Sequence, residues 1–450
     1  NLIDGSYSLT PKVADLITGG PRVDLRRYLP VGYVIDGSVD YATQVQQWAD
    51  NCSANHKKCI APAGVFKINS TITISDRNAW EIEGSRPDWS GGGTTFLWGG
   101  ADNGTMFNVS GCRWFEIGKI LLDGNSTAGV GLWLQKSASN PFDSFTSHGL
   151  YVKNVRGTPG VGLYLGQTAT GTGMNDIDLY GYHSYINREG VRTDGAGGQS
   201  IKFHGGIIYC ESQVPILADT IAVNMNNGGF VTATDLQIIY CQTHYLMNTA
   251  SAVLNLFGGY GEYWTHDTLL NWVNHSSGAV NIIGTVNAGA TDNMFIYGGG
   301  SLNLHSENNH YESDNNVLAA AGNQLVKLSS INDTFTVAGA GWVNNTSYDY
   351  TYLVDGNKVK DGPTGTLAWD PGPLVDNASV TSSGITINGA ISYGDTVEWG
   401  APYVLDNVTS VKAEISNAAA KQVTITLYNR TGSTFNPGSG TWKVRVRRAW

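Results

Sequence analysis

The 450 residues of this chain exceed what one ordinary compact core accommodates, so the length predicts either several domains or one elongated repeat. Only 14% of the residues are charged, 57 are glycine and the hydrophobic fraction is 41%, which excludes both a disordered and a mainly helical chain. The net charge of −10 argues against a nucleic-acid partner, and no segment approaches the roughly 20 apolar residues of a membrane span, so membrane insertion is not expected.

The N-terminal part of the chain contains one helical pattern. Residues 1–32 lack strong periodicity and are interpreted as a tail or the remainder of an upstream region. Apolar residues then recur at helical spacing, which predicts a helix over about 41–52 with Asp40 placed to cap it. Two short strand patterns separated by a turn follow, in 59–68 and 71–75.

From there to about residue 340 the chain repeats one pattern. Short apolar runs are separated by Gly, Asn, Asp or Ser, and the runs begin at intervals of roughly 20–30 residues. No helical segment is long enough to connect parallel strands in βαβ units. The pattern therefore indicates an all-β fold, which is a sandwich, a propeller or a parallel β-solenoid.

An internal repeat favours the solenoid. The hexapeptide at 207–212 matches the one at 238–243 nearly residue for residue. In a solenoid, equivalent positions of successive coils stack about 4.8 Å apart, so like residues form ladders. Extending the register of the repeat predicts one column of four tyrosines: Tyr182, Tyr209, Tyr240 and Tyr260.

The composition changes near the C-terminus. Residues 349–376 are rich in Gly, Pro and polar residues and are interpreted as a linker that follows a β-helix over 33–348. Residues 377–450 alternate between polar and apolar positions, which predicts an antiparallel β-sandwich. The basic cluster in its last strand is interpreted as a solvated strand face: Lys443, Arg445, Arg447 and Arg448.

The five cysteines suggest little redox or metal chemistry. Cys52 and Cys59 could pair across a short loop. Cys112, Cys210 and Cys241 lie in apolar runs and are interpreted as small buried hydrophobic residues. No Cys/His spacing is typical of zinc, so neither a metal nor another cofactor is expected.

Two N-terminal segments carry a family resemblance. Residues 36–49 and 60–74, with an Asp-rich turn before the helix and a Pro-Ala-Gly turn after it, resemble the start of pectate-lyase-like β-helix proteins. The resemblance covers about residues 33–130 and is closest to bacteriophage tailspikes and capsular polysaccharide depolymerases. It implies a single-stranded right-handed parallel β-helix with an N-terminal capping helix, a C-terminal β-module, a homotrimer, and a polysaccharide ligand met outside cells or on a virion tail. It does not specify the chemistry, because the family includes hydrolases, lyases, epimerases and non-catalytic binders.

Hydrolysis of a polysaccharide would need two carboxyl groups, one protonated and one charged. Extending the tyrosine register by two residues places Glu211 and Glu262 in one column, two coils and about 9–10 Å apart. An inverting pair of carboxyl groups is about 6.5–9.5 Å apart, so we predict these two residues as the acid/base pair of an endo-acting glycosidase. The alternative is that both are solvated turn residues.

Aromatic and polar residues gather around this pair. The segment 260–267 brings Trp264, His266 and the further acid Asp267 close to Glu262, as a sugar site requires. The further residues predicted to contact the sugar are Tyr182, His183, Arg188, Tyr240 and Tyr260. A second cluster in 305–314 offers Glu307 as a spare acid and Glu312 as a sugar contact. Its two histidines lie five residues apart on a presumed strand and turn, so a metal is not expected there.

Two other functions stay open. A polysaccharide lyase would need a Tyr or His base beside a cation, and the stretch from Tyr182 and His183 to Arg188 fits that description loosely. A histidine among tyrosines is, however, more often a hydrogen-bonded structural residue. The third hypothesis is a non-catalytic glycan-binding adhesin or virion fibre.

Overall fold

The computed structural model of the chain describes most of the residues after residue 21. Among them, no helix is both long and apolar enough to cross a membrane. The described ranges are 22–88, 90–166, 175–194, 200–210, 220–226, 229–248, 251–262, 268–273, 277–290, 295–297, 301–313, 318–320, 325–331, 333–337, 350–354, 364–387, 396–401, 410–436 and 439–447.

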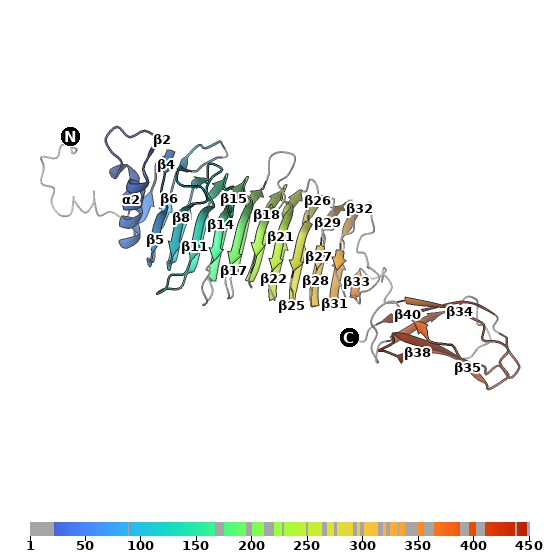
Figure 1. Ribbon diagram of the computed structural model, residues 1–450. Helices are drawn as coiled ribbons and strands as arrows, with labels where there is room; N and C mark the ends of the chain where they lie inside the picture. Colours follow the sequence, from blue (N-terminus) through green and yellow to red (C-terminus); the bar gives the residue numbers. More distant parts are fainter. Residues whose placement is uncertain are drawn as a thin grey trace.

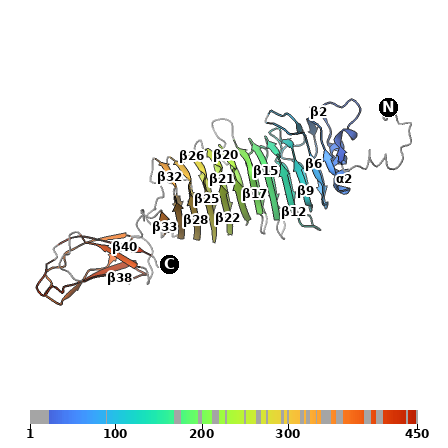
Figure 2. The same cartoon turned by 180° about the vertical axis from the view of Figure 1, so that it is seen from behind.

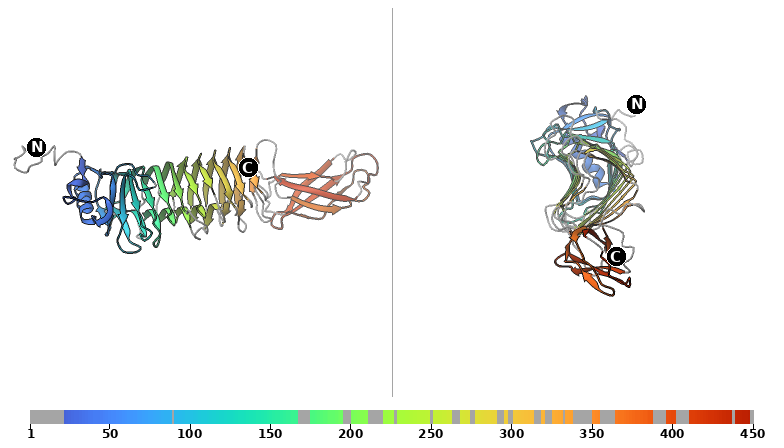
Figure 3. Two further views of the ribbon diagram at one scale, coloured as in Figure 1. Left: turned by 90° about the horizontal axis from the view of Figure 1, so that it is seen from above. Right: turned by 90° about the vertical axis from the view of Figure 1, so that its right-hand side faces the viewer.

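The chain forms a rod of stacked coils followed by a smaller β-module (Figure 1). Each coil contributes strands to three parallel sheets, and the view along the rod shows the coils superposed around one interior (Figure 3). Large apolar side chains fill that interior along its length, from Val23 to Tyr311. The parallel β-helix expected from the repeats is confirmed.

The first sheet carries the outer face on which the candidate site lies. Its neighbouring strands pair in parallel. Its strands are β1 (Arg22–Asp24), β3 (Lys58–Ile60), β6 (Glu81–Glu83), β9 (Arg113–Gly118), β12 (Asp143–His148), the first halves of β15 (Asn175–Tyr185) and β17 (Ser200–Tyr209), β19 (Gly229–Thr234), β22 (Ser251–Phe257), β25 (Ser277–Ile283), β28 (Ser301–Glu307), β31 (Leu325–Ile331) and β33 (Tyr350–Val354).

The second sheet shares a corner with the first, because β15 and β17 run through that corner without interruption. Its other strands are β2 (Asp36–Asp40), β4 (Gly64–Ile68), β7 (Thr94–Trp98), β10 (Ile120–Asp123), β13 (Tyr151–Lys153), β20 (Gln237–Ile239), β23 (Tyr260–Glu262), β26 (Val286–Ala290), β29 (His310–Ser313) and β32 (Thr334–Val337).

The third sheet closes the coil and has ten strands in the order of the chain. They are β5 (Ile72–Ser75), β8 (Thr105–Ser110), β11 (Val130–Gln135), β14 (Val161–Gly166), β16 (Glu189–Asp194), β18 (Ile221–Met225), β21 (Thr243–Asn248), β24 (Thr268–Val273), β27 (Phe295–Tyr297) and β30 (Leu318–Ala320).

One residue in the left-handed conformation makes the corner between the first and second sheets in coil after coil. Its backbone N–H donates to the carbonyl of the residue that precedes the corner of the next coil, as Gly149 does to Tyr180. Gly, Asn and Asp adopt this conformation most readily, which explains the frequent Gly and Asn of the sequence pattern. The corner residues are Lys119, Gly149, Gly181, Gly205, Asp235, Gly258, Gly284 and Asn308.

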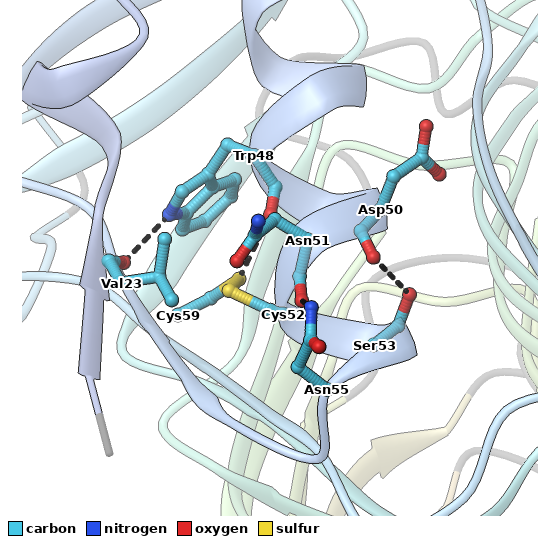
Figure 4. Close-up of a disulfide and its surroundings, with 8 residues drawn as sticks. All are labelled: Val23, Trp48, Asp50, Asn51, Cys52, Ser53, Asn55 and Cys59. Atoms are coloured by element: carbon cyan, nitrogen blue, oxygen red, sulfur yellow. Dashed lines mark hydrogen bonds between the residues drawn. A yellow bond between two sulfur atoms is a disulfide. The ribbon is translucent and has the colours of Figure 1, made fainter. Parts of the chain in front are cut away.

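The capping helix α2 (Ala42–Ala54) closes the N-terminal end of the rod. The N-cap is Tyr41 rather than Asp40 as expected, but Asp40 Oδ1 still accepts a hydrogen bond from the N–H of Ala42, the first residue of the helix, at 3.0 Å. The buried Trp48 donates from Nε1 to the carbonyl of Val23 at 2.9 Å, and a disulfide ties Cys52 to Cys59 (Figure 4). The helix is therefore attached to both β1 and β3.

The cysteine interpretation was wrong for two residues. Cys210 and Cys241 form a disulfide between neighbouring coils, with their Cα atoms 4.9 Å apart, whereas we expected two separate buried thiols. Strand stacking brings residues 31 positions apart in sequence into contact, which a search for short loops does not detect. Cys112 is free and buried, as expected.

The single column of four tyrosines that the repeat predicted is confirmed only in part: the rings of Tyr209 and Tyr240 are in contact, with centroids 5.5 Å apart, but the backbone register differs and Tyr182 lies outside the column. Tyr182 pairs with Gly206, while Tyr209 pairs with Tyr185 and with Ile239. The two hexapeptides are thus out of register by one residue along their strands. The extra position is accommodated at Tyr240, whose backbone adopts the left-handed conformation, at φ 54°. The cysteines that follow can then meet although the tyrosine backbones do not align.

The C-terminal module contains two antiparallel sheets around a core of their own, which confirms the expected sandwich. Figure 2 shows the module beyond the last coil, at the end opposite α2. Of the strands within the expected linker 349–376, β33 pairs in the β-helix and β34 in the module. The module's strands are β34 (Thr364–Trp369), β35 (Ser379–Thr381), β36 (Ile385–Thr386), β37 (Thr396–Gly400), β38 (Ser410–Asn417), β39 (Gln422–Tyr428) and β40 (Gly440–Arg447).

Candidate active site

The outer face of the first sheet carries two neighbouring columns of polar and aromatic side chains. Alternate residues of each strand point outward, and the parallel register stacks them coil upon coil. One column, which we call the charged column, contains Lys58, Glu81, Glu116, Thr146, Asp178 and Lys202. The other, the aromatic column, includes His148, Tyr180 and His204.

The N-terminal end of this face is hollowed. The hollow has a volume of about 590 Å³, and its walls come from β3, β6, β9 and β12 and from the turns that precede the first two of these strands. We call it the N-terminal hollow. Residues from both the charged column and the turns line it, including Lys57, Lys58, Glu81, Trp114, Glu116 and Thr146.

Two carboxyl groups lie side by side in the hollow. Glu81 and Glu116 are register partners on β6 and β9, which places their backbones about 4.8 Å apart. The Glu81 carboxylate is ion-paired with the Lys58 ammonium at 2.5 Å. Lys58 and Lys119 also pair with Glu83, so this end of the face is a small ionic network. Glu116 lies outside this network, with His148 Nε2 at 3.8 Å from its carboxylate.

The protonation of Glu116 follows from these neighbours. Burial raises the pKa of the Glu116 carboxyl above its ordinary value, and the negative charge of Glu81 raises this pKa further. His148 and Lys58 oppose the shift without reversing it. The two neighbouring carboxyl groups are therefore in unlike environments: Glu81 faces a lysine, and Glu116 has a pKa above its ordinary value.

Trp114 supplies an aromatic surface beside the carboxyl groups. Its side chain is 61% exposed although it lies on the wall of the hollow. The backbone of Trp114 is left-handed, at φ 51°. Beneath it, the rings of Trp80 and Phe115 stack with centroids 4.7 Å apart and fill the interior of the coil. The exposed indole is free to pack against a ligand, since the core below is complete without it.

The aromatic column offers ring edges rather than ring faces. Tyr180 is stacked between His148 and His204, with centroid distances of 4.7 and 4.2 Å. Stacking covers the faces of the inner ring and leaves the polar atoms of the rings at the outer surface. His204 Nε2 contacts Asp178 Oδ1 at 2.9 Å, which joins this column to the charged column.

The structure brings three of the predicted site residues together on the second sheet. The Tyr240 hydroxyl donates to Glu262 Oε1 at 2.8 Å, and the Tyr260 hydroxyl donates to Glu262 Oε2 at 3.4 Å. This carboxylate raises the pKa of Tyr240 to about 12, so the phenol keeps its proton at neutral pH. Glu262 is therefore held by two phenols on a face other than that of Glu116.

The stretch from Tyr182 to Arg188 is mostly structural. Tyr182 was predicted to contact substrate, but it is fully buried and donates to the carbonyl of Gly190 at 2.9 Å. His183 stacks on Tyr151 with centroids 4.2 Å apart, and burial lowers its pKa to about 4. The aliphatic stem of Arg188 packs over Gly160. Tyr182 is thus a core residue with no access to a polysaccharide, because its position after the corner points inward.

The remaining predicted residues fall elsewhere. Glu307 lies on β28, where His305 Nε2 is 3.3 Å from its carboxylate, many strands from Glu116 and on a different sheet from Glu262. The backbone of Glu312 lies in β29 and pairs with Thr336, but its side chain is outside the description. Four predicted residues lie outside the described residues: Glu211, Trp264, His266 and Asp267.

A further ionic cluster occupies the third sheet. Arg192 lies between Glu189 and Asp194, at 3.3 and 3.0 Å. Asp194 also accepts from the Tyr164 hydroxyl at 2.6 Å, and Asn224 donates to Glu189 at 3.0 Å. Glu189 is only 9% exposed, and burial raises its pKa. The cluster satisfies its charges internally, which is typical of a structural network.

Sequence reasoning missed Glu81, Trp114 and Glu116. They come from two strands and belong to no single motif, and they meet only because β6 and β9 are neighbours. The available signal was the alternation within 113–118, where an aromatic and an acidic residue occupy consecutive outward positions of a strand. That signal shows which side chains of one strand point outward, but it does not show which other strand lies next to it.

Comparisons with known proteins show similarity of fold. The chain matches no family model and no curated protein. A tailspike protein mutant of E. coli bacteriophage HK620, in complex with a hexasaccharide, aligns with 97% of this chain and 95% of its own, at 11% identity and a TM-score of 0.51. DFA-IIIase from Arthrobacter chlorophenolicus A6 without its lid covers 75% of this chain and 95% of its own, at 12% identity and a TM-score of 0.49. ORF18 of Geobacillus virus E2 covers 97% of this chain and 79% of its own, at 12% identity and a TM-score of 0.44. The chain therefore has the parallel β-helix fold found in a phage tailspike. At this level of identity the similarity covers the fold and does not extend to the chemistry.

Proposed function

We propose that this protein binds a polysaccharide along the outer face of the first sheet and hydrolyses it in the N-terminal hollow. The observation that carries the proposal is the pairing of Glu81 with Glu116 on neighbouring strands, in one hollow with the exposed ring of Trp114. Glycoside hydrolysis requires two carboxyl groups whose environments favour opposite protonation states. The surroundings of the two residues differ, because Glu81 is ion-paired with Lys58 whereas burial raises the pKa of Glu116.

Glu116 is the general acid in this proposal. Its raised pKa keeps a proton available at a higher pH than an ordinary glutamate would. The acid donates this proton to the glycosidic oxygen as the bond to the anomeric carbon breaks. The same group, then deprotonated, takes a proton from the water that completes the reaction.

Glu81 is the nucleophile. Its ion pair with Lys58 fixes the position of the carboxylate beside Glu116. Carboxyl groups about 5–5.5 Å apart are typical of retaining enzymes, and adjacent strands about 4.8 Å apart match that separation. Attack of the Glu81 carboxylate on the anomeric carbon would form a glycosyl–enzyme ester, which water then hydrolyses.

A different second carboxylate would give the opposite stereochemistry. Asp178 lies in the charged column two strands beyond Glu116, or about 9.6 Å along the stack. That separation suits an inverting pair with a water molecule between the carboxyl groups. The pair of Glu211 and Glu262 remains a prediction of the same type, because Glu211 lies outside the described residues.

The rest of the face supports binding of an extended chain. The indole of Trp114 offers a ring face to the apolar side of a sugar. The aromatic column offers hydroxyl and imidazole edges as hydrogen-bond partners for sugar hydroxyls. Because the sheet continues beyond the hollow to Lys202 and His204, the protein would hold a polymer across the reacting bond and cleave it internally.

A lyase is the second candidate, and the described residues favour it less. Elimination needs a base that accepts a proton from carbon. Tyr240 keeps its own proton at neutral pH because its pKa is about 12. His183, with a pKa of about 4, is also unsuited because it is a weak base. Unsaturated chain ends in the products would nevertheless decide for this candidate.

The setting of the protein is part of the proposal. We propose a homotrimer that acts on a bacterial capsular or exopolysaccharide, outside cells or on a virion tail, as the family resemblance implies. A monomer in sedimentation experiments would contradict the trimer. A non-catalytic adhesin or virion fibre would bind the polysaccharide along the same face without shortening it.

The proposal is tested by replacing the acid. Glu116→Gln is expected to lower the release of new reducing ends from a cleaved polysaccharide by at least about 100-fold, since general acid catalysis contributes that much or more. Binding of the polymer should persist, because the amide keeps the shape of the side chain. Glu414→Gln, in an exposed pair with Lys412 of the C-terminal module, is the matched control and should keep full activity. Near-normal cleavage by Glu116→Gln would refute the assignment, and an absence of shortening by the unchanged protein would favour the adhesin.

A further inference from the structure

One cation in the N-terminal hollow has no counter-ion in the part of the chain that the structure describes. Lys58 is neutralised by Glu81 and Glu83, but within the described residues no carboxylate lies within ion-pairing distance of the Lys57 ammonium. Lys57 nevertheless lines the hollow and is half-buried. Lysine stems commonly lie along a surface while the ammonium stays accessible, so the ammonium of Lys57 is available to a ligand in the hollow.

The backbone holds Lys57 in place. It lies within the loop closed by the disulfide between Cys52 and Cys59. Its N–H donates to the carbonyl of Cys52 at 3.0 Å, and its carbonyl accepts from the N–H of Glu81 at 3.2 Å. The loop therefore fixes the position of this lysine relative to the proposed nucleophile, although no carboxylate among the described residues pairs with its ammonium.

The charges of the hollow favour an anion. Its two lysines face Glu81 and Glu116, and only the first of these carboxyl groups is ion-paired with a lysine. Because Glu81 pairs with Lys58 and no described carboxylate lies within ion-pairing distance of Lys57, the ammonium of Lys57 is the charge of the lining that is left for a ligand. The exposed indole of Trp114 lines the same hollow and suits a sugar ring.

We propose that the N-terminal hollow recognises an acidic sugar residue of the polysaccharide, whose carboxylate binds the Lys57 ammonium while its ring packs on Trp114. The inference rests on the proposed function for the position of the polymer, and it adds the substrate class. A charge-assisted hydrogen bond from an ammonium to a carboxylate is stronger than a neutral one, so a carboxylate-bearing sugar is selected over its neutral analogue.

The test compares an acidic polymer with its neutral counterpart. Xanthan, gellan and hyaluronan are used, each in its native form and after chemical reduction of the uronate carboxyl groups to alcohols. Binding is measured by affinity electrophoresis at low salt with the full chain carrying Glu116→Gln, so that the polymer is not consumed. We expect at least one native polymer to bind, and its reduced form to bind about tenfold more weakly.

Variants then locate the effect. Adding Lys57→Gln should weaken binding of the native polymer about tenfold and leave the reduced polymer unaffected, whereas Lys57→Arg should retain binding. The matched control is Lys67→Gln on β4 of the second sheet, which should change neither. Equal binding of native and reduced polymers, binding to none of the native polymers, or insensitivity to Lys57→Gln would each overturn the inference.

The two proposals fail separately. Binding that depends on Lys57, with no shortening of the polymer by the unchanged protein, would remove the hydrolase and keep acid recognition. Equal cleavage of native and reduced polymers would keep the hydrolase and remove acid recognition.

Discussion

Glu81 and Glu116 occupy paired positions on neighbouring strands, and Lys58 is ion-paired with the first carboxylate but not with the second. Neighbouring positions of a parallel β-helix thus present two chemically different carboxyl groups to one hollow. The difference comes from burial and counter-charge rather than from residue type, because both residues are glutamates.

The pH dependence of cleavage should follow Glu116. An acid must be protonated to act, so kcat/KM should fall as the pH rises through the raised pKa of this residue. His148 favours the charged form of Glu116, so His148→Gln should move this decline to higher pH. The measurement is kcat/KM against pH for both proteins, with His305→Gln on β28 as the control. A decline that stays in place or moves to lower pH would contradict this relationship.

The stereochemistry of the product should identify the second carboxylate. If Glu81 is the nucleophile, the first product released carries the anomeric configuration of the substrate. Nuclear magnetic resonance spectra recorded during the first minutes of cleavage show this before the anomers equilibrate. Inversion would point to Asp178 or to another base at a distance and would exclude a covalent intermediate on Glu81.

Two adjacent glycines at one corner should differ sharply in their tolerance of a side chain. Gly205 is left-handed, at φ 68°, and a Cβ there would meet no atom within 4 Å. Gly206 is at φ 113°, and a Cβ there would lie 2.3 Å from the carbonyl oxygen of Tyr182. Gly205→Ala should cost about 1 kcal/mol of unfolding free energy and Gly206→Ala roughly 3 kcal/mol or more. Urea denaturation measures both, and equal losses would contradict the described corner.

The buried His244 should make the protein sensitive to acid. Burial lowers its pKa to about 3, below the value of about 6.5 in an unfolded chain. The unfolded state therefore binds more protons between these values, and this residue makes stability fall as the pH is lowered from about 6.5, by about 1.4 kcal/mol per pH unit. His244→Gln should show a shallower loss of unfolding free energy between pH 6.5 and 5, whereas His305→Gln should not. Parallel profiles for the unchanged protein and His244→Gln would show that His244 is not held neutral.

The sequence was sufficient to predict the elements and much of their arrangement. The helix α2, the repeated short strands and the C-terminal sandwich each have a local signal, because periodicity and turn residues are properties of neighbouring positions in the chain. The sequence also indicated that Cys52 and Cys59 could form a disulfide, because only a short loop separates them. Each of these features depends on residues that are close in sequence.

Register between coils could not be predicted in the same way. The corner residues are separated by variable numbers of residues, so a shift by one position is invisible until the strands are paired. Such a shift pairs the backbone of Tyr209 with Ile239 rather than with Tyr240, although the two tyrosine rings still touch, and Tyr182 lies buried outside their column. The site formed by Glu81, Trp114 and Glu116 depends wholly on the pairing of β6 with β9, so it was found only in the structure.

The most direct test of the proposed site is a crystal structure of Glu116→Gln with a bound oligosaccharide of the cleaved polymer. Sugar rings should lie along the outer face of the first sheet, with one ring on the indole of Trp114 and a glycosidic oxygen within hydrogen-bond distance of residue 116. An oligosaccharide bound instead beside Tyr240 and Glu262 on the second sheet, or on the C-terminal module alone, would contradict the proposed site.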